Sequence, residues 1–307
     1  MAPETPESLK IGRSACLRKF VLEVLRGMVI GLANIIPGVS GGTMMVSMGI
    51  YDTLIHCITH LFKEFKKSVM TLLPYAIGMA VAIGALSFAL KWAFANYALP
   101  TNTLFIGLIL GGLPAILRQV KGKKKGPVGA VLFLAFFALI ILMQLFQSEN
   151  SVTIQLSVVE VLKLFVLGAV ASATMIIPGV SGSMILKILG YYEPVVTVGI
   201  PGLLTGLRYG DWAAVAANLG ILVPFGLGVI VGIFAIAKLI EVLLARWEGQ
   251  TYCAILGLVA ASPVAILMST NMSNLGWGTL LVSLVTFALG FYVAWRMSGT
   301  EEPAPKA

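Results

Sequence analysis

Long apolar segments separated by short polar or basic stretches occupy most of the 307-residue chain. A helix needs roughly 20 mainly apolar residues to cross the hydrocarbon of a bilayer. Two longer apolar stretches, 18–58 and 158–200, each contain a break, and each opens a group of shorter ones. We therefore predict an all-α polytopic membrane protein with membrane helices over residues 69–95, 102–117, 127–147, 213–243, 252–269 and 276–295.

The break in each long stretch is a repeated motif. The sequence Ile-Ile-Pro-Gly-Val-Ser-Gly occupies residues 35–41 and recurs at 176–182, an offset of 141 (176 − 35). Proline disfavours helical geometry in the residue before it, glycine allows the backbone to reverse, and serine is a preferred N-cap. Each motif therefore predicts a helix, a tight break capped by Ser40 or Ser181, and a second helix. Together these form a re-entrant hairpin that enters and leaves the membrane on one side.

The first turn after each break has N–H groups that lack helical partners and carry partial positive charge. Such groups suit an anion, and either a phosphate or a carboxylate would fit. Two broken helices in corresponding halves of a membrane protein indicate the binding site of a transporter. The alternative is that the small residues serve only close helix packing. The N–H groups concerned belong to Gly41, Gly42 and Thr43 and to Gly182, Ser183 and Met184.

The two halves, 18–147 and 158–296, are predicted to be inverted repeats. Each contains one hairpin and three crossings, an odd number of passages, so the second half starts from the opposite side of the membrane. Basic residues favour cytoplasmic loops, and their distribution indicates the same topology, with cytoplasmic tails at 1–17 and 297–307. The outside loops hold little beyond Arg208, whereas the inside segments hold Lys10, Arg13, Arg18, Lys19, Lys63, Lys66, Lys67, Arg118, Lys121, Lys123, Lys124, Lys125, Arg246, Arg296 and Lys306.

Five charged residues inside the hairpins are candidates for function, because ionisable groups at membrane depth are costly. Glu23 and Arg26 are three residues apart on the first half-helix, a spacing that suits an ion pair. Lys187 follows the second cap, where its ammonium could meet a bound anion or extend to the membrane surface. Asp52 and Glu193 occupy equivalent places, each after a tyrosine. They either anchor the interface or, with Glu23, couple transport to a cation or proton.

Other polar groups favour ordinary explanations. His56 and His60 share a helix face with Asp52 at a spacing that resembles metal ligands, but their place beside a basic loop favours a solvated helix end, so no metal site is predicted. We find no zinc-protease, nucleotide-binding or nucleophile-elbow motif, and we predict neither enzymatic activity nor a cofactor. Two further pairs are expected to be helical ion pairs, Glu160–Lys163 and Lys238–Glu241.

Composition supports the membrane assignment. The chain is 58% hydrophobic and only 11% charged, with a mean hydropathy of +0.97, which no soluble globular protein would show. A net charge of +8 could suggest nucleic acid, but the basic residues lie in short loops beside apolar spans, so no nucleic-acid partner is predicted. No cleavable signal peptide is evident. Three isolated cysteines predict no disulfide framework: Cys16, Cys57 and Cys253.

The paired motifs make the chain similar to the polyprenyl-phosphate transporter family over about residues 18–296, with the Pro-Gly-Val-Ser-Gly segments 37–41 and 178–182 as its marks. The resemblance implies that the protein returns undecaprenyl phosphate, the lipid carrier of envelope glycan synthesis, from the outer to the inner leaflet of the bacterial cytoplasmic membrane. Ser183 stands where the first copy has Gly42, so the two copies need not be equivalent. The implied headgroup ligands, to which we add the cations Arg26 and Lys187, are Pro37, Gly38, Val39, Ser40, Gly41, Gly42, Thr43, Pro178, Gly179, Val180, Ser181, Gly182 and Ser183.

Two alternatives to a lipid transporter stay open. A secondary transporter of a small soluble anion would use the same half-helix sites without a lateral opening to lipid. A lipid-modifying enzyme, such as a phosphatase, would need an acid–base or nucleophilic cluster that the sequence does not show. Inward movement of an anion opposes an inside-negative potential by about 2.3 kcal/mol per charge per 100 mV. We therefore expect a co-transported proton or sodium ion, or consumption of the lipid inside. The sequence predicts no particular oligomeric state.

Overall fold

The computed structural model describes residues 6–35, 40–123, 126–146, 152–270, 272 and 276–298. All regular structure in these residues is helical, and no strand occurs among them. Five of the described helices are long and apolar enough to cross a membrane, and a sharply bent pair of helices offers a sixth crossing. The predicted all-α polytopic architecture is confirmed.

The first half of the chain begins with a long helix that starts earlier than predicted. Residues 6–17, expected to be part of a tail, belong to α1, and the predicted helix 69–95 is divided by a π-helical turn. The elements are α1 (Pro6–Ile35), α2 (Gly41–Ser47), α3 (Tyr51–Thr59), α4 (Phe65–Val81), η1 (Ala82–Leu86), α5 (Ser87–Asn96), α6 (Ala98–Val120) and α7 (Gly126–Leu145).

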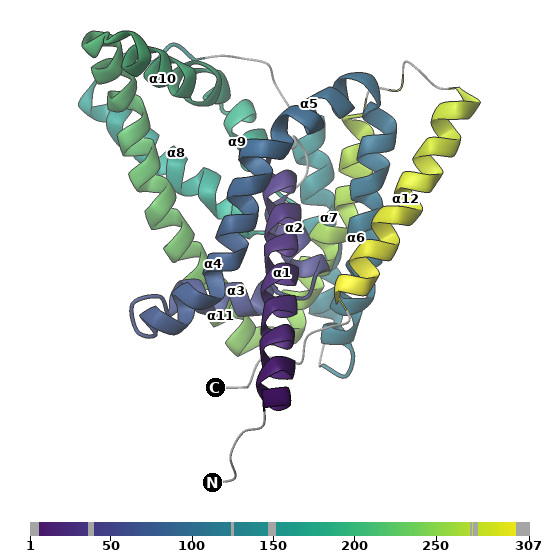
Figure 1. Ribbon diagram of the computed structural model, residues 1–307. Coiled ribbons are helices and arrows are strands. Elements are labelled where there is room, and N and C mark those ends of the chain that lie inside the picture. The colour runs from purple at the N-terminus through teal and green to yellow at the C-terminus, as the bar shows by residue number, and fades with distance from the viewer. Residues whose placement is uncertain are drawn as a thin grey trace.

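The second half differs from expectation mainly in one very long helix. The predicted helices 213–243 and 252–269 are joined in α11, which bends at Trp247, where φ is −134° and ψ is 50°. The bend divides α11 into a first and a second arm that form a V in Figure 1. The elements are α8 (Val158–Ile176), α9 (Gly182–Ile188), η2 (Glu193–Gly199), α10 (Ile200–Tyr209), α11 (Trp212–Met268) and α12 (Trp277–Ser298).

Both hairpins contain a second break that the sequence pattern did not predict. The expected half-helix 40–58 is divided after seven residues, because Gly49 adopts a left-handed φ of +73°. Gly190 does the same in the second hairpin, with a φ of +78°. A left-handed glycine ends a helix at little steric cost, whereas residues with a Cβ resist that conformation. Each motif is therefore followed by a short helix and a turn rather than by one long half-helix.

In each half, a close contact between a glycine and the backbone of another helix joins a pair of helices, and the two pairs correspond. A Cβ built on Gly78 of α4 would lie 2.0 Å from the carbonyl oxygen of Val24 in α1. A Cβ on Gly228 of α11 would lie 1.9 Å from the carbonyl oxygen of Phe165 in α8. The offset between the two glycines is 150 (228 − 78), so α4 on α1 matches the first arm of α11 on α8. Small residues at such crossings let helix backbones approach closely in a membrane.

Replacing Gly228 with alanine is expected to lower the thermal stability of the purified protein. The added methyl group must push α11 and α8 apart, and overpacking of this kind costs about 1–3 kcal/mol. The measurement is thermal unfolding in detergent. Gly226→Ala is the matched control in the same helix, because nothing lies within 4 Å of its Cβ position. Equal stability of the two variants would contradict this account of the crossing.

The remaining long helices exchange partners between the halves. α6 of the first half packs on α12 of the second, and α7 packs on α11. In Figure 1, α1 and α4 run upward from the bottom of the view, whereas α8 and the first arm of α11 run downward. The two halves are therefore interleaved. The helices that lead to the two motifs, α1 and α8, come from opposite ends of the molecule.

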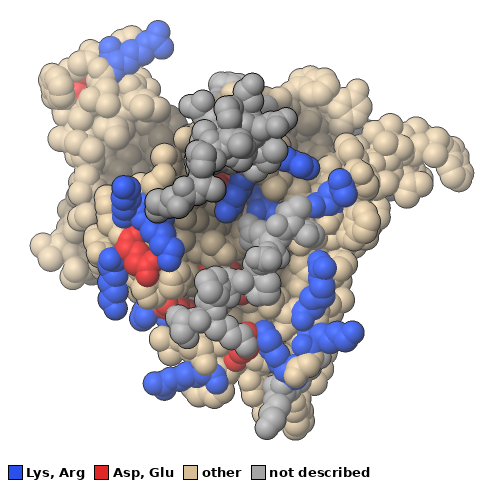
Figure 2. All heavy atoms as spheres, turned by 60° about the horizontal axis from the view of Figure 1, so that its bottom comes forward, with Lys and Arg blue, Asp and Glu red and all other residues tan. Residues whose placement is uncertain are grey.

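Basic side chains gather at one end of the molecule. Figure 2 shows Lys and Arg on the face that lies at the bottom of Figure 1. The turn after α3, the end of α6 and the bend of α11 lie at that end. Their basic residues are Lys63, Lys66, Lys67, Arg118, Lys121, Lys123 and Arg246.

Candidate functional site

The two repeated motifs meet in space and bind each other directly. The amide N–H of Gly179 donates to Thr43 Oγ1 at 2.6 Å, and Ser40 Oγ donates to the carbonyl oxygen of Ile177 at 3.3 Å. A Cβ on Gly42 would lie 2.6 Å from the carbonyl oxygen of Ile176. Residues more than 130 positions apart in the chain thus form one site. The predicted ligands Pro37, Gly38 and Val39 lie outside the described residues.

Gly179 makes the second break possible. α8 ends at Ile176, α9 begins at Gly182, and Gly179 between them has a φ of +82°. A Cβ at Gly179 would also lie 2.7 Å from the carbonyl oxygen of Leu258 in α11. Both the backbone conformation and the close approach to α11 require glycine.

A cavity of about 400 Å³ lies beside the joined motifs, between α8, α9, η2 and the first arm of α11. Its lining is mainly apolar, and we call it the polar cavity for the polar side chains that the motifs and neighbouring helices place in it. Two of its residues come from the first half of the chain, Asn34 and Ser40. Hydroxyl and amide groups can donate to an anion, and several of them converge here. The lining residues are Asn34, Ser40, Ala171, Ser172, Met175, Val180, Ser181, Gly182, Ser183, Leu186, Tyr192, Val196, Phe225 and Val229.

Ser40 and Ser181 occupy the predicted cap positions, but their side chains do not cap the helices. Both have extended backbones, with φ, ψ of −109°, 133° and −98°, 129°, and neither side chain accepts a hydrogen bond from the following helix. Ser40 Oγ reaches the other motif instead, and Ser181 Oγ lies 2.8 Å from Ser183 Oγ. Since one hydroxyl of the Ser181–Ser183 pair donates to the other, the second O–H can donate to a ligand in the cavity.

Part of the predicted set of amide donors is already engaged. Gly41 N–H donates to Asn34 Oδ1 at 3.2 Å, and Met184 N–H donates to the carbonyl oxygen of Ser181 at 3.1 Å. α2 and α9 are each seven residues long, so their helix dipoles are small. The arrangement favours side-chain hydroxyls over bare amides as the donors of this site.

The two predicted cations lie in different surroundings. Arg26 is buried, with 2% of its surface exposed, and its Nη2 donates to the carbonyl oxygen of Met297 at 2.7 Å. It is not among the residues that line the polar cavity. Lys187 Nζ lies 5.3 Å from the ring centre of Tyr192, which does line the cavity. Of the two predicted cations, Lys187 therefore contacts a residue that lines this cavity.

The three predicted coupling residues lie in different parts of the structure. Glu23 Oε1 lies 3.9 Å from Lys19 Nζ on the same helix. Glu193 begins η2 next to Tyr192 at the polar cavity. Asp52 lies in the first turn of α3 and accepts a hydrogen bond from the hydroxyl of Tyr252 in the second arm of α11.

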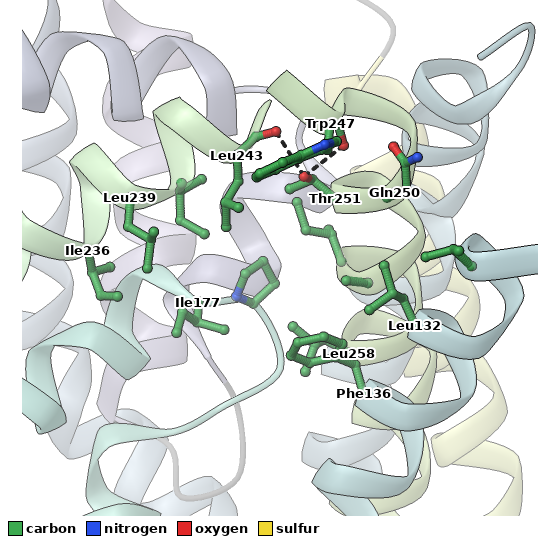
Figure 3. A pocket seen from close by; sticks show the side chains of 15 residues that line it. Leu132, Phe136, Ile177, Ile236, Leu239, Leu243, Trp247, Gln250, Thr251 and Leu258 are labelled. Carbon is green, nitrogen blue, oxygen red and sulfur yellow. Dashed lines mark hydrogen bonds between the residues drawn. The ribbon is translucent and has the colours of Figure 1, made fainter. Parts of the chain in front are cut away.

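A second cavity, of about 550 Å³, lies on the other side of the α8–α9 turn (Figure 3). α7, the turn and both arms of α11 form its apolar walls. The hydroxyl of Thr251 contributes no free donor, because it bonds the carbonyl oxygens of Leu243 at 3.1 Å and Trp247 at 2.9 Å. Ile177 and Pro178 line this apolar cavity while Val180 to Ser183 line the polar one, so the turn separates the two.

The two predicted helical ion pairs are confirmed. Glu160 lies 3.1 Å from Lys163, and Glu241 lies 2.6 Å from Lys238. Glu241, rather than Asp52, approaches the histidine pair, and ligand atoms of His56, His60 and Glu241 lie within 4.8 Å of one another. We assign no metal ion to this group, because Lys238 already neutralises Glu241 and His60 Nδ1 lies 3.2 Å from the carbonyl oxygen of His56.

Asn34, Ser172 and Tyr192 are cavity residues that the motif did not include. The sequence signal for Asn34 is that it is a polar residue just before the proline break. The counterpart of Asn34 at the offset of 141, Met175, lines the same cavity. Ser172 resembles an ordinary small packing residue, and its hydroxyl donates to the carbonyl oxygen of Ala169 at 2.9 Å. Only the fold brings it to the site.

Comparison with known proteins shows the family to which the chain belongs. A family model described as undecaprenyl phosphate translocase-like matches residues 30–280. A protein of Staphylococcus aureus named polyprenyl-phosphate transporter is 32% identical over 278 residues, covering 89% of this chain and 94% of that protein. A Vibrio cholerae protein of the same name is 29% identical over 251 residues, covering 76% and 73%. No solved structure matches the chain. The protein described here is a member of the undecaprenyl phosphate translocase-like family.

Proposed function

We propose that the protein returns undecaprenyl phosphate from the outer to the inner leaflet of the bacterial cytoplasmic membrane, where the carrier is reused in envelope glycan synthesis. The observation that carries the proposal is the polar cavity shared by the two motifs, in a chain whose relatives are named transporters of polyprenyl phosphate. Those relatives are not named as enzymes, and we propose transport without chemical change of the lipid.

The headgroup would bind between the paired turns. Removing water from an ion costs several kcal/mol, so the site must replace the lost hydration with donors. Charge-assisted hydrogen bonds are the strongest available. Ser181 and Ser183 would supply hydroxyl donors, Gly182 an amide, and Lys187 a positive charge near Tyr192. Thr43 and Gly179 would hold the motifs together without contacting the phosphate.

The prenyl chain would use the apolar cavity on the other side of the turn. A phosphate on a long hydrocarbon needs an apolar surface beside its polar site once the headgroup passes the turn toward the inner leaflet. Pro178 lines the apolar cavity, and later residues of the same motif line the polar cavity. This neighbourhood favours a lipid over a small soluble anion, which would have no use for the apolar walls.

We further propose that the two halves are inverted repeats and that the basic face is cytoplasmic. Support for inversion comes from the matched glycine crossings of α4 on α1 and α11 on α8, and from the opposite directions of those helices in Figure 1. Support for the orientation comes from the basic residues in Figure 2, because lysine and arginine favour the cytoplasmic side. Both chain ends would then be cytoplasmic.

Inward transport of the phosphate would need a driving force. The anion moves against an inside-negative potential, at about 2.3 kcal/mol per charge per 100 mV. A cation that accompanies the phosphate offsets this cost. Glu23, Asp52 and Glu193 are the acidic groups that could carry a proton or hold a cation.

A competition experiment separates the lipid from a soluble anion. Short-chain polyprenyl phosphate is expected to displace labelled undecaprenyl phosphate from the purified protein, whereas the same concentration of inorganic phosphate, sulfate or acetate is not. The physical reason is that the soluble anions gain nothing from the apolar cavity. Displacement by a soluble anion as effective as displacement by the lipid would instead support transport of that anion.

A further inference from the structure

Asp52 is a half-buried residue whose carboxylate has an unusual environment. Tyr252 donates a hydrogen bond to its Oδ2, and its Oδ1 is buried with no hydrogen-bond partner among the described residues. The hydroxyl of Tyr51, on the preceding residue, is likewise buried and unpartnered within that part of the chain. Unpaired buried polar atoms cost free energy, and an ionised carboxylate costs most.

The charges of the described residues around Asp52 do not balance. Lys123 is the described cation beside this group, with its Nζ 4.6 Å above the Tyr252 ring centre. Lys123 already pairs with Glu248 at 2.5 Å. Among the described residues, two carboxylates therefore share one ammonium group, and this described group carries one excess negative charge whenever Asp52 is ionised.

A proton restores the balance better than a metal cation. Hard cations take about six to eight oxygen ligands, whereas the oxygens without partners here are Asp52 Oδ1 and Tyr51 Oη. A proton on Oδ1 needs no shell of ligands, removes the excess charge and leaves the bond from Tyr252 intact.

The position of Asp52 links this proton to the motif. Asp52 lies in the first turn of α3, which follows α2 of the first motif after the left-handed turn at Gly49. Its partner Tyr252 lies in the second arm of α11, in the other half of the chain. A movement of the first hairpin that separates Asp52 from the second arm of α11 would break this contact, and water from the basic face could then reach the carboxylate.

We propose that Asp52 is the proton-binding group that couples lipid transport to proton entry. It is protonated on Oδ1 while it contacts Tyr252, and it releases the proton to cytoplasmic water when that contact opens. The proposal rests on the proposed function and selects Asp52 over Glu23 and Glu193. The O–H bond on Asp52 forms with a proton taken from water on the outer side and breaks when that proton passes to cytoplasmic water, so one proton enters with each lipid phosphate. The inward proton reduces the net negative charge that crosses the membrane.

Other titratable groups face α3 and must be separated from Asp52. His56 and His60 lie one and two turns further along the helix, with ring centres 4.1 Å apart. His60 Nδ1 lies 3.4 Å from Glu241 of α11, which also pairs with Lys238. Glu248 and Lys123 lie near Tyr252, as described above. Because these histidines lie on the same helix as Asp52, a test of Asp52 includes His56→Gln and His60→Gln.

The test uses the full chain in liposomes with the membrane potential clamped. If one proton accompanies each lipid, a gradient of one pH unit shifts the equilibrium distribution of polyprenyl phosphate about tenfold. We expect this shift in the wild type and in both histidine variants. Asp52→Asn is expected to equilibrate the lipid with no response to the gradient. The matched control Asp211→Asn, at a cap that asparagine also serves, is expected to keep the tenfold shift.

A pH response that persists in Asp52→Asn, or is absent from the wild type while lipid transport proceeds, would overturn the coupling proposal and leave the proposed function standing. If the wild type moves no polyprenyl phosphate, the proposed function fails instead. The protonation of Asp52 is then tested alone by infrared spectroscopy at neutral pH. A protonated carboxyl band that disappears in Asp52→Asn supports the proton site, and its absence from the wild type refutes it.

Discussion

Replacing Ser181 with alanine is expected to weaken the binding of undecaprenyl phosphate about tenfold to a hundredfold. A hydrogen bond to a charged group contributes about 1.5–3 kcal/mol, and each 1.4 kcal/mol or so is a factor of ten in Kd. Ser181 and Ser183 form a hydroxyl pair in which one O–H remains able to donate to the phosphate. The measurement is the Kd of the purified protein for undecaprenyl phosphate.

The arrangement of the serines also predicts an order of effects. Ser40 Oγ donates to the carbonyl oxygen of Ile177, so its hydrogen is less available to an anion, and Ser40→Ala is expected to weaken binding less than Ser181→Ala. Ser269→Ala is the control, because Ser269 lies outside the cavity and its hydroxyl bonds the carbonyl oxygens of its own helix. Equal Kd values for Ser181→Ala, Ser269→Ala and the wild type would remove the serine pair from the site.

Replacing Gly179 with alanine is expected to abolish most transport. Alanine in a left-handed conformation costs about 1–2 kcal/mol, and the new methyl group would lie 2.7 Å from the carbonyl oxygen of Leu258. The turn must therefore shift, and the bond from Gly179 N–H to Thr43 Oγ1 shifts with it. Because this bond joins the two motifs, its displacement should separate the groups that bind the headgroup. The measurement is the initial rate of lipid transport in liposomes.

Gly122 provides a control with the same backbone cost but no contact. Its φ is +83°, close to the +82° of Gly179, and nothing lies within 4 Å of its Cβ position. Gly122→Ala should lose about the same stability from backbone strain and keep its transport rate. If both variants lose transport equally, the effect comes from backbone strain alone, and the contact between the motifs has no special role.

The sequence repeat predicted the shared features of the two halves. The same heptapeptide produces a break before Gly41 and before Gly182, and the two serines take the cap positions. The second breaks were missed because a glycine in an apolar run is compatible with both a helix and a left-handed turn, and Gly49 and Gly190 adopt the turn. The polar stretch at Arg246 predicted two separate helices, but the backbone continues through it as one helix that bends at Trp247.

Contacts between distant parts of the chain explain what the sequence could not predict at the site. Tyr252 reaches Asp52 across 200 positions, and Glu241 takes the place beside His60 that the spacing had suggested for Asp52. The prediction that the serine side chains cap the helices was wrong for a similar reason. Local sequence predicts which residue begins a helix, but the side chain of Ser40 bonds to the other motif because the fold brings a carbonyl group within reach.

The position of the phosphate in a structure of the protein with bound undecaprenyl phosphate is the most direct test of the account. The phosphorus atom is expected between the two motifs, with its oxygens within hydrogen-bond distance of Ser181 or Ser183. A phosphate bound away from both motifs, with the cavity between them filled by side chains, would contradict the account.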